Sequence, residues 1–144
     1  MACSRRQFLQ VIPVSLGCGA LASALGGCDV GASVDGSVEV TGGQAVASFA
    51  QFPALATVGG GVVVSAGGVP VAIIRTASDA VVALSAVCTH AGCTVGYAGN
   101  QSLHCPCHGS SFSSTGAVTA GPASRPLERI AATLHAADVT LTGL

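Results

Sequence analysis

The sequence predicts an all-β fold, a small antiparallel β-sandwich or barrel whose loops carry the function. Three observations predict it. Short runs rich in Val and Ile alternate with turns of Gly and polar residues, none of these runs has a sustained helical period, and 144 residues leave room for one core. Only 3% of the residues are aromatic, so we expect small side chains to fill that core.

Charge excludes one class of partner. The formal net charge is −1, charged residues make up 8% of the chain, and no Lys is present. Binding to a nucleic-acid backbone requires clustered Lys and Arg side chains. We therefore expect no nucleic-acid partner.

The first 27 residues predict an export signal or anchor. Arg5 and Arg6 precede 22 uncharged residues that run from Gln7 to Cys28. A positive start followed by an apolar stretch is typical of a signal peptide, and the paired arginines resemble a twin-arginine signal, which directs folded proteins across the bacterial inner membrane. We expect a location in the periplasm or at the outer face of that membrane, with an amphipathic or buried helix as the alternative interpretation.

The end of this segment predicts how the chain is held. Residues 25–28 (LGGC) resemble a lipobox, in which the Cys becomes a lipidated N-terminus. Lipidation at Cys28 would tether the protein to the membrane surface. Two alternatives remain: the segment stays as a membrane helix, since about 20 apolar residues span a bilayer, or it is removed and the protein is left soluble.

Residues 28–45 predict a flexible tether that leads into a first strand. The stretch is rich in Gly, Ser, Val, Asp and Thr and lacks large core residues over most of its length. Residues 46–144 then form the folded domain. Its expected strands are the β-branched runs between turns, at 61–64, 69–75, 80–85, 94–97, 102–104, 117–119, 130–134 and 139–141.

Two loops hold the residues that carry chemistry. Residues 88–93 (CTHAGC) and 105–110 (CPCHGS) contain four of the seven Cys and two of the four His. Such a cluster predicts a metal site. Zinc is one hypothesis, with Cys88, His90, Cys105 and His108 as a tetrahedral set, but it leaves the other two cysteines of the loops without a role.

The motifs C-x-H-x-G-C and C-P-C-H-G-S resemble the two boxes of the Rieske iron–sulfur proteins at every defining position. The resemblance continues through Phe112 and through residues 115–116 (TG) and 121–123 (GPA), and reaches loosely back to Val46. It covers about the last two thirds of the chain. It implies a Rieske-type antiparallel β-sandwich with two cluster-binding loops and one [2Fe–2S] cluster.

The same resemblance assigns the ligands. It implies that Cys88 and Cys105 bind one iron and that His90 and His108 bind the other. It also implies a disulfide between Cys93 and Cys107, which suits a protein outside the reducing cytoplasm. Because two neutral imidazoles replace two thiolates, the cluster carries less negative charge and its reduction potential rises.

The resemblance also implies roles for three residues near the cluster. Ser110 lies where high-potential members place a hydroxyl that hydrogen-bonds a bridging sulfide. Phe112 lies where those members have a Tyr, and because a Phe ring cannot donate, we expect a potential below the upper range of the family. Pro122 belongs to a loop that covers the cluster from a third side, or is an ordinary turn proline.

The remaining polar residues predict no further chemistry. His104 and His135 are expected at the surface, and Tyr97 is expected in packing. The sequence has no paired-carboxylate motif, no Ser/His/Asp motif and no Gly-rich phosphate loop. We therefore expect an electron-transfer subunit of an oxidoreductase and not a stand-alone enzyme.

Three functional hypotheses follow. The first is the iron–sulfur subunit of a membrane quinol-oxidising respiratory complex, with quinol and a cytochrome as partners. The second is a periplasmic Rieske carrier or a small subunit of an oxidoreductase such as arsenite oxidase. The third, a ferredoxin of an aromatic-ring dioxygenase, is disfavoured by Cys93, Cys107 and the Arg5-Arg6 pair, because such ferredoxins are cytoplasmic and lack the disulfide.

Overall fold

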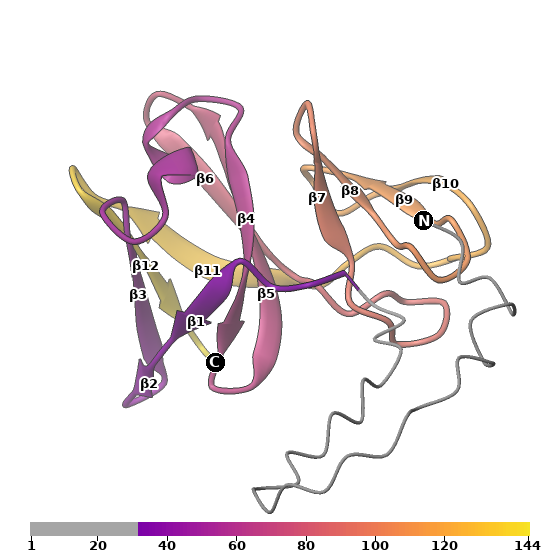
Figure 1. Ribbon diagram of the computed structural model, residues 1–144, viewed down its shortest axis with the longest axis horizontal. Coiled ribbons are helices and arrows are strands. Elements are labelled where there is room, and N and C mark those ends of the chain that lie inside the picture. The colour runs from indigo at the N-terminus through magenta and orange to yellow at the C-terminus, as the bar shows by residue number, and fades with distance from the viewer. Residues whose placement is uncertain (1–31) are drawn as a thin grey trace, which may run out of the picture.

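The computed structural model describes residues 32–144, which form β-strands, turns and one short 3₁₀ helix (Figure 1). The predictions for the export signal at Arg5 and Arg6 and for lipidation at Cys28 lie outside these residues. No helix within residues 32–144 is long and apolar enough to cross a bilayer.

The described chain contains twelve strands. Their bounds, with that of the 3₁₀ helix η1, are β1 Gly36–Val38, β2 Val40–Thr41, β3 Gln44–Ser48, η1 Pro53–Ala56, β4 Gly61–Ala66, β5 Val69–Ala77, β6 Ala80–Ser85, β7 Gly96–Gly99, β8 Ser102–His104, β9 Ser111–Ser113, β10 Val118–Ala120, β11 Arg129–Leu134 and β12 Asp138–Thr142.

The larger sheet has eight strands in the order β1-β4-β5-β6-β11-β12-β3-β2. Strands β1 and β2 follow one another in the chain yet lie at opposite edges of this sheet, so the sheet curls back on itself. Its pairs are antiparallel except for β1 with β4, which is parallel. The prediction of antiparallel sheets is therefore confirmed with one exception among the described strands.

The smaller sheet is an excursion from the larger one. Strands β6 and β11 are neighbours in the eight-stranded sheet, and at their ends the backbone N–H of Ser85 donates to the carbonyl of Glu128 at 2.8 Å. Residues 86–127 leave the sheet between these two strands and form the four-stranded meander β10-β9-β8-β7. The meander stands beside the larger sheet, on the side away from β3 and β12 (Figure 1).

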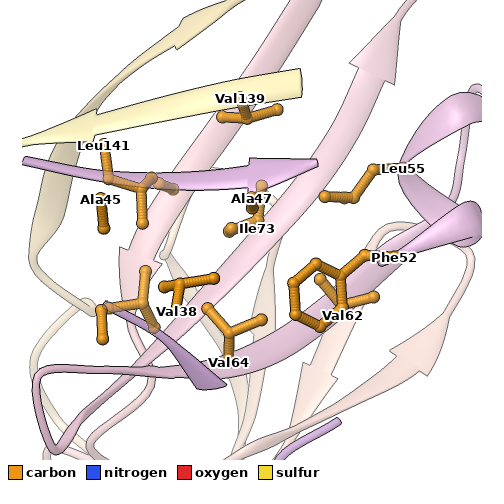
Figure 2. Close-up of a cluster of buried hydrophobic side chains, with 13 residues drawn as sticks. Val38, Ala45, Ala47, Phe52, Leu55, Val62, Val64, Ile73, Val139 and Leu141 are labelled. Atoms are coloured by element: carbon orange, nitrogen blue, oxygen red, sulfur yellow. The ribbon is translucent and has the colours of Figure 1, made fainter. Parts of the chain in front are cut away.

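Two buried clusters lie on the two faces of strands β4, β5 and β6. Val62, Val64 and Ile73 belong to the cluster that fills the curled sheet (Figure 2). Their neighbours Val63 and Ile74 belong to the other cluster, against the meander. Because successive side chains of a strand point to opposite faces, a strand buried on both faces has a continuous apolar run. The expectation of one core is thus wrong. Because the side chains are small, one sheet packs against a separate buried cluster on each of its faces.

The chain forms strands before the expected start of the domain at position 46. Strands β1 and β2 lie inside residues 28–45, which the sequence predicted as a flexible tether, and Val38 is buried in the core. Residues 36–41 are therefore part of the larger sheet. The composition concealed β1 because a three-residue strand at a sheet edge needs only one apolar side chain. Strand β9 was also missed, since two serines flank its one buried residue, Phe112.

Candidate metal centre

The first loop is built on a tight turn that begins at Cys88. The backbone N–H of Cys88 donates to the carbonyl of Cys93, and the N–H of Gly92 donates to the carbonyl of Cys88, both at 2.8 Å. Gly92 has φ +78°, a conformation that costs other residues about 1–2 kcal/mol. The turn thus places Cys88 in the interior and His90 at the surface.

The second loop repeats this turn at Cys105. The N–H of Cys105 donates to the carbonyl of Ser110 at 2.7 Å, and the N–H of Gly109 donates to the carbonyl of Cys105 at 3.0 Å. Gly109 also has φ +78°. Both loops therefore share one backbone frame, in which the glycine comes four residues after the first Cys.

Each of these two cysteines receives two backbone hydrogen bonds at its sulfur. The N–H groups of His90 and Ala91 donate to Cys88, and those of Cys107 and His108 donate to Cys105. The donors are the residues two and three positions after the Cys in both loops. Such donors stabilise a thiolate, the form of Cys that binds metals.

The two thiols lie against one another. Both are buried, Cys88 with 3% and Cys105 with 1% of its surface exposed. Burial acts to raise the pKa of the Cys88 thiol, but hydrogen bonds from His90, Cys105, Ala91 and Ser110 leave its pKa below the ordinary value. The pKa of Cys105 is raised by burial and because its thiol donates to Cys88. The two buried sulfurs are thus in direct hydrogen-bond contact.

The two loops also bring their histidines together. The ring centroids of His90 and His108 are 4.9 Å apart, with the rings nearly perpendicular at 86°. Both side chains are exposed. The site therefore has an inner pair of sulfurs and an outer pair of imidazoles, and each loop supplies one member of each pair.

The remaining cysteines of the loops form the predicted disulfide. Cys93 and Cys107 are bonded, with their Cα atoms 6.6 Å apart. Their sulfurs and that of Cys105 lie within 4.8 Å of one another, but a disulfide sulfur is not a thiolate and does not serve as a metal ligand. The disulfide prediction is confirmed, and Cys88 and Cys105 remain as the free thiols of the described chain.

Ser110 is fully buried beside the thiols. Its Oγ accepts a hydrogen bond from the backbone N–H of Ala123 at 3.1 Å, and its hydroxyl hydrogen-bonds the sulfur of Cys88. A buried hydroxyl is stable only when it is hydrogen-bonded. Ser110 thus joins the second loop to the first loop and to the segment 121–127.

That segment is held against both loops. A Cβ on Gly121 would lie 2.5 Å from the Cα of Ser110, so only Gly permits this approach. The Thr89 hydroxyl donates to the carbonyl of Arg125 at 2.6 Å, and the N–H of Leu127 donates to the carbonyl of Gly116 at 2.9 Å. Pro122 is exposed between these attachments, so it lies in a third segment beside the site.

The other residues singled out from the sequence lie nearby or apart. Phe112 is fully buried in the cluster that contains Cys88 and Cys105. His104 is exposed, and its Nδ1 lies 3.2 Å from the hydroxyl of Ser111. The Tyr97 hydroxyl donates to the carbonyl of Gly59 and so joins β7 to the larger sheet, as the packing prediction requires. The sequence analysis missed the role of Thr89 in attaching the first loop to Arg125. The position of Thr89 next to His90 is the one sequence feature that points to it.

The donor set fits a [2Fe–2S] cluster. Two buried thiols face each other, backbone N–H groups point at both sulfurs, and two imidazoles meet at the outer side. Structural zinc sites are closed by four ligands around one ion, whereas here the sulfurs and the imidazoles form two separate pairs. Two pairs suit two metal ions.

Comparison with protein families gives the same result. Residues 45–132 match the family model described as the Rieske [2Fe-2S] domain. The match covers both loops, the segment 121–127 and most of both sheets.

Curated relatives match over shorter stretches. The cytochrome b6-f complex iron-sulfur subunit of Synechococcus sp. (strain JA-3-3Ab) is 49% identical over 57 residues, which are 39% of this chain and 33% of that protein. The subunit of the same name from Chlorobaculum thiosulfatiphilum is 38% identical over 72 residues, 49% of this chain and 39% of that protein. The chain thus spans about a third of the length of the curated relatives it matches.

Solved structures share the fold. The cyanobacterial plasma membrane Rieske protein PetC3 from Synechocystis PCC 6803 superposes with a TM-score of 0.54 at 30% identity, over 66% of this chain and 94% of that one. The ferredoxin of carbazole 1,9a-dioxygenase from Nocardioides aromaticivorans IC177 has a TM-score of 0.53 at 22% identity, over 69% and 95%, and supports the fold alone. The predicted all-β, Rieske-type fold is confirmed.

Proposed function

Because the chain belongs to the Rieske [2Fe–2S] family, we propose that Cys88, His90, Cys105 and His108 hold its cluster and that it is the electron-transfer subunit of a membrane quinol-oxidising complex. One observation carries the assignment of ligands: the two loops share a backbone frame that places both cysteines inside and both histidines outside. Bound in this site, the cluster supplies one-electron redox chemistry at a potential raised by its neutral imidazole ligands.

The cysteines and the histidines have different roles in this proposal. Cys88 and Cys105 would hold one iron, and their burial keeps water from the sulfurs. His90 and His108 are exposed and would hold the other iron. An imidazole that binds metal through one of Nδ1 and Nε2 keeps the other for a proton, so either His can accept a hydrogen bond or a proton from a quinol hydroxyl at the surface.

Relatives support the assembly that we propose. The curated relatives of the chain include iron-sulfur subunits of cytochrome b6-f complexes. A quinol as donor and a cytochrome as acceptor follow from that kinship. Export by the twin-arginine route and a lipid tether at Cys28 complete the proposal; the similarity to a plasma membrane Rieske protein from Synechocystis supports a location at a membrane.

A second candidate is a periplasmic carrier, or a small subunit of an oxidoreductase such as arsenite oxidase. Phe112 favours it, because a fully buried Phe stands where high-potential relatives place a Tyr hydroxyl. The short link between the loops favours it too, since Cys93 and Cys105 are joined by the single hairpin β7–β8. Both features are compatible with a lower potential and a protein partner in place of quinol.

An EPR-monitored redox titration of the full chain separates these functions. It is done at neutral and at alkaline pH on protein isolated with its cluster. A rhombic signal with a positive potential that falls as the pH rises supports quinol oxidation. A low potential that does not change with pH supports the carrier, and a sample without any iron signal contradicts both.

A further inference from the structure

One charged side chain stands alone at the end of the molecule that holds the site. Residues 86–127 contain a single Asp, Glu, Lys or Arg, which is Arg125. The rest of the described chain carries two arginines and five acidic residues, so residues 32–144 have a formal net charge of −2. The acidic residues are Asp35, Glu39, Asp79, Glu128 and Asp138.

Arg125 lies at a groove beside the first loop. The groove has a volume of about 720 Å³ and is lined by Thr89, His90, Arg125, Pro126 and Glu128, among others. The hydrogen bond from the Thr89 hydroxyl to the Arg125 carbonyl fixes the backbone there. The charge is therefore held close to the exposed His90 by a fixed backbone.

The guanidinium of Arg125 is free to meet a partner. It is exposed, and none of the residues that the structure describes pairs with it. Arg75 is different: it donates to the carbonyls of Ala77, Leu55 and Ser78 and lies over the ring of Phe49. The guanidinium of Arg75 thus has an internal structural role, whereas that of Arg125 has none among the described residues.

The other exposed residues around the histidines have small, uncharged side chains. They include Ala91, Gly92, Pro106, Gly109 and Pro122. Such a surface lets another protein approach closely without removing water from charged groups, which would cost free energy. Glu128 is the acidic residue of the groove, but it lies at the sheet side of the groove, directly before β11.

We propose that His90, His108 and Arg125 form the docking face for a redox protein that presents acidic side chains around its own redox centre. This proposal rests on the proposed electron-transfer function. The guanidinium of Arg125 favours an acidic partner at this face, because it lies at contact distance while the acidic residues of the larger sheet are farther away and are screened by salt. Arg125 then pairs with a carboxylate at the rim, where the pair adds to association rate and orientation.

Two small oxidants of opposite charge test the proposal. The full chain, isolated with its cluster and reduced, is mixed with hexacyanoferrate(III), charge 3−, or tris(phenanthroline)cobalt(III), charge 3+. Stopped-flow absorbance gives the second-order rate constants from 10 to 200 mM salt, a range over which the screening length falls from about 30 Å to below 10 Å. We expect the charge of Arg125 to raise the rate with hexacyanoferrate and to lower the rate with the cobalt complex, relative to a variant without this charge, and we expect both differences to shrink as salt increases.

Arg125→Gln identifies the charge responsible. At 10 mM salt it lowers the rate with hexacyanoferrate by about three- to ten-fold, and the difference from the wild type shrinks as salt increases, as expected for one charge close to a trivalent ion. Arg129→Gln is the matched control, because it removes the same charge from β11, outside the groove. Its rate stays within about two-fold of the wild type. Arg125→Lys retains the charge and the salt dependence.

The outcomes separate the two proposals. An EPR spectrum of the same wild-type sample establishes the cluster, and its absence would contradict the proposed function and with it the docking face. With the cluster present, an Arg125→Gln rate with hexacyanoferrate equal to the wild-type rate at 10 mM salt overturns the docking face alone. Equal effects of Arg125→Gln and Arg129→Gln overturn it too, since overall charge would then govern the rate. Arg125→Ala gives the same comparison if Arg125→Gln fails to fold, since the side chain is exposed.

Discussion

The loops at Cys88 and Cys105 have the same backbone and carry different side chains on it. In both, the Cys carbonyl accepts from a Gly four residues later, and the Cys N–H donates to the carbonyl five residues later. In both, the sulfur accepts from the second and third N–H groups that follow. The histidine, however, is the second residue after the Cys in the first loop and the third in the second.

This difference separates what the backbone does from what the side chains do. The frame presents a buried sulfur in either loop, and it needs only a Cys followed by a Gly at the fourth position. The position five residues after the Cys shows the contrast best. It holds Cys93, half of the disulfide, in the first loop and Ser110, a buried hydrogen-bonding hydroxyl, in the second. One frame thus provides a covalent link on one side and a polar contact on the other.

The largest expected effect tests whether the two sulfurs are equivalent. Cys88→Ser and Cys105→Ser are each expected to abolish the cluster, because a serine hydroxyl does not replace a thiolate at iron. Iron content, sulfide content and visible absorbance of the purified chain measure this. His104→Asn, next to Cys105 but exposed, is the control and keeps the cluster. Retention of the cluster by one Ser variant alone would show that the loops are not equivalent.

Removal of the disulfide tests the covalent side of the comparison. Cys93→Ser combined with Cys107→Ser opens a link across 14 positions of sequence, and we expect the free energy of unfolding to fall by about 3 kcal/mol. Guanidinium denaturation of the full chain measures the change. Wild-type protein treated with a reductant is the control and should show a similar loss. Unchanged stability would mean that noncovalent contacts alone hold the loops together.

Ser110→Ala tests the hydrogen bonds that Ser110 makes in the second loop, at the position that Cys93 occupies in the first. It leaves the N–H of Ala123 without its partner in the interior and removes a donor from the sulfur of Cys88, so we expect a loss of about 2 kcal/mol and a lower reduction potential. Ser111→Ala, at the neighbouring half-buried residue, is the matched control and should leave the potential unchanged. Equal potentials in both variants would remove Ser110 from any role in tuning the cluster.

The smallest expected effect, on stability, tests the backbone conformation that the two loops share. Gly92→Ala and Gly109→Ala both meet open space at φ +78°, so each should cost about 1 kcal/mol of stability from backbone strain alone. Gly68→Ala, at φ +90° in the turn between β4 and β5, is the control for strain away from the site. It should lower the melting temperature without reducing the cluster content. Clearly unequal losses at the two loop glycines would contradict a common frame.

The sequence predicted the strands that are β-branched runs between turns and missed β1 and β9, which have no such run. Runs such as those in β4 and β5 are visible because they are continuously apolar, and β6 was predicted with its observed bounds. Strand β1 was missed because its parallel partner, β4, lies far along the chain, and local composition carries no record of distant pairing. In the site, the cysteines and histidines were identified by motif and resemblance. The attachment of Thr89 to Arg125 was not, since a hydroxyl bonded to a carbonyl leaves no sequence pattern.

The pairing of β6 directly with β11 has a consequence for how such a protein can change over time. All four proposed cluster ligands lie in residues 86–127, between two strands that pair directly with one another. The strand pairing of the larger sheet therefore does not depend on the length or sequence of the segment between β6 and β11. The redox part can lengthen, shorten or be exchanged as a cassette, while the scaffold keeps its own pairing and its own interior.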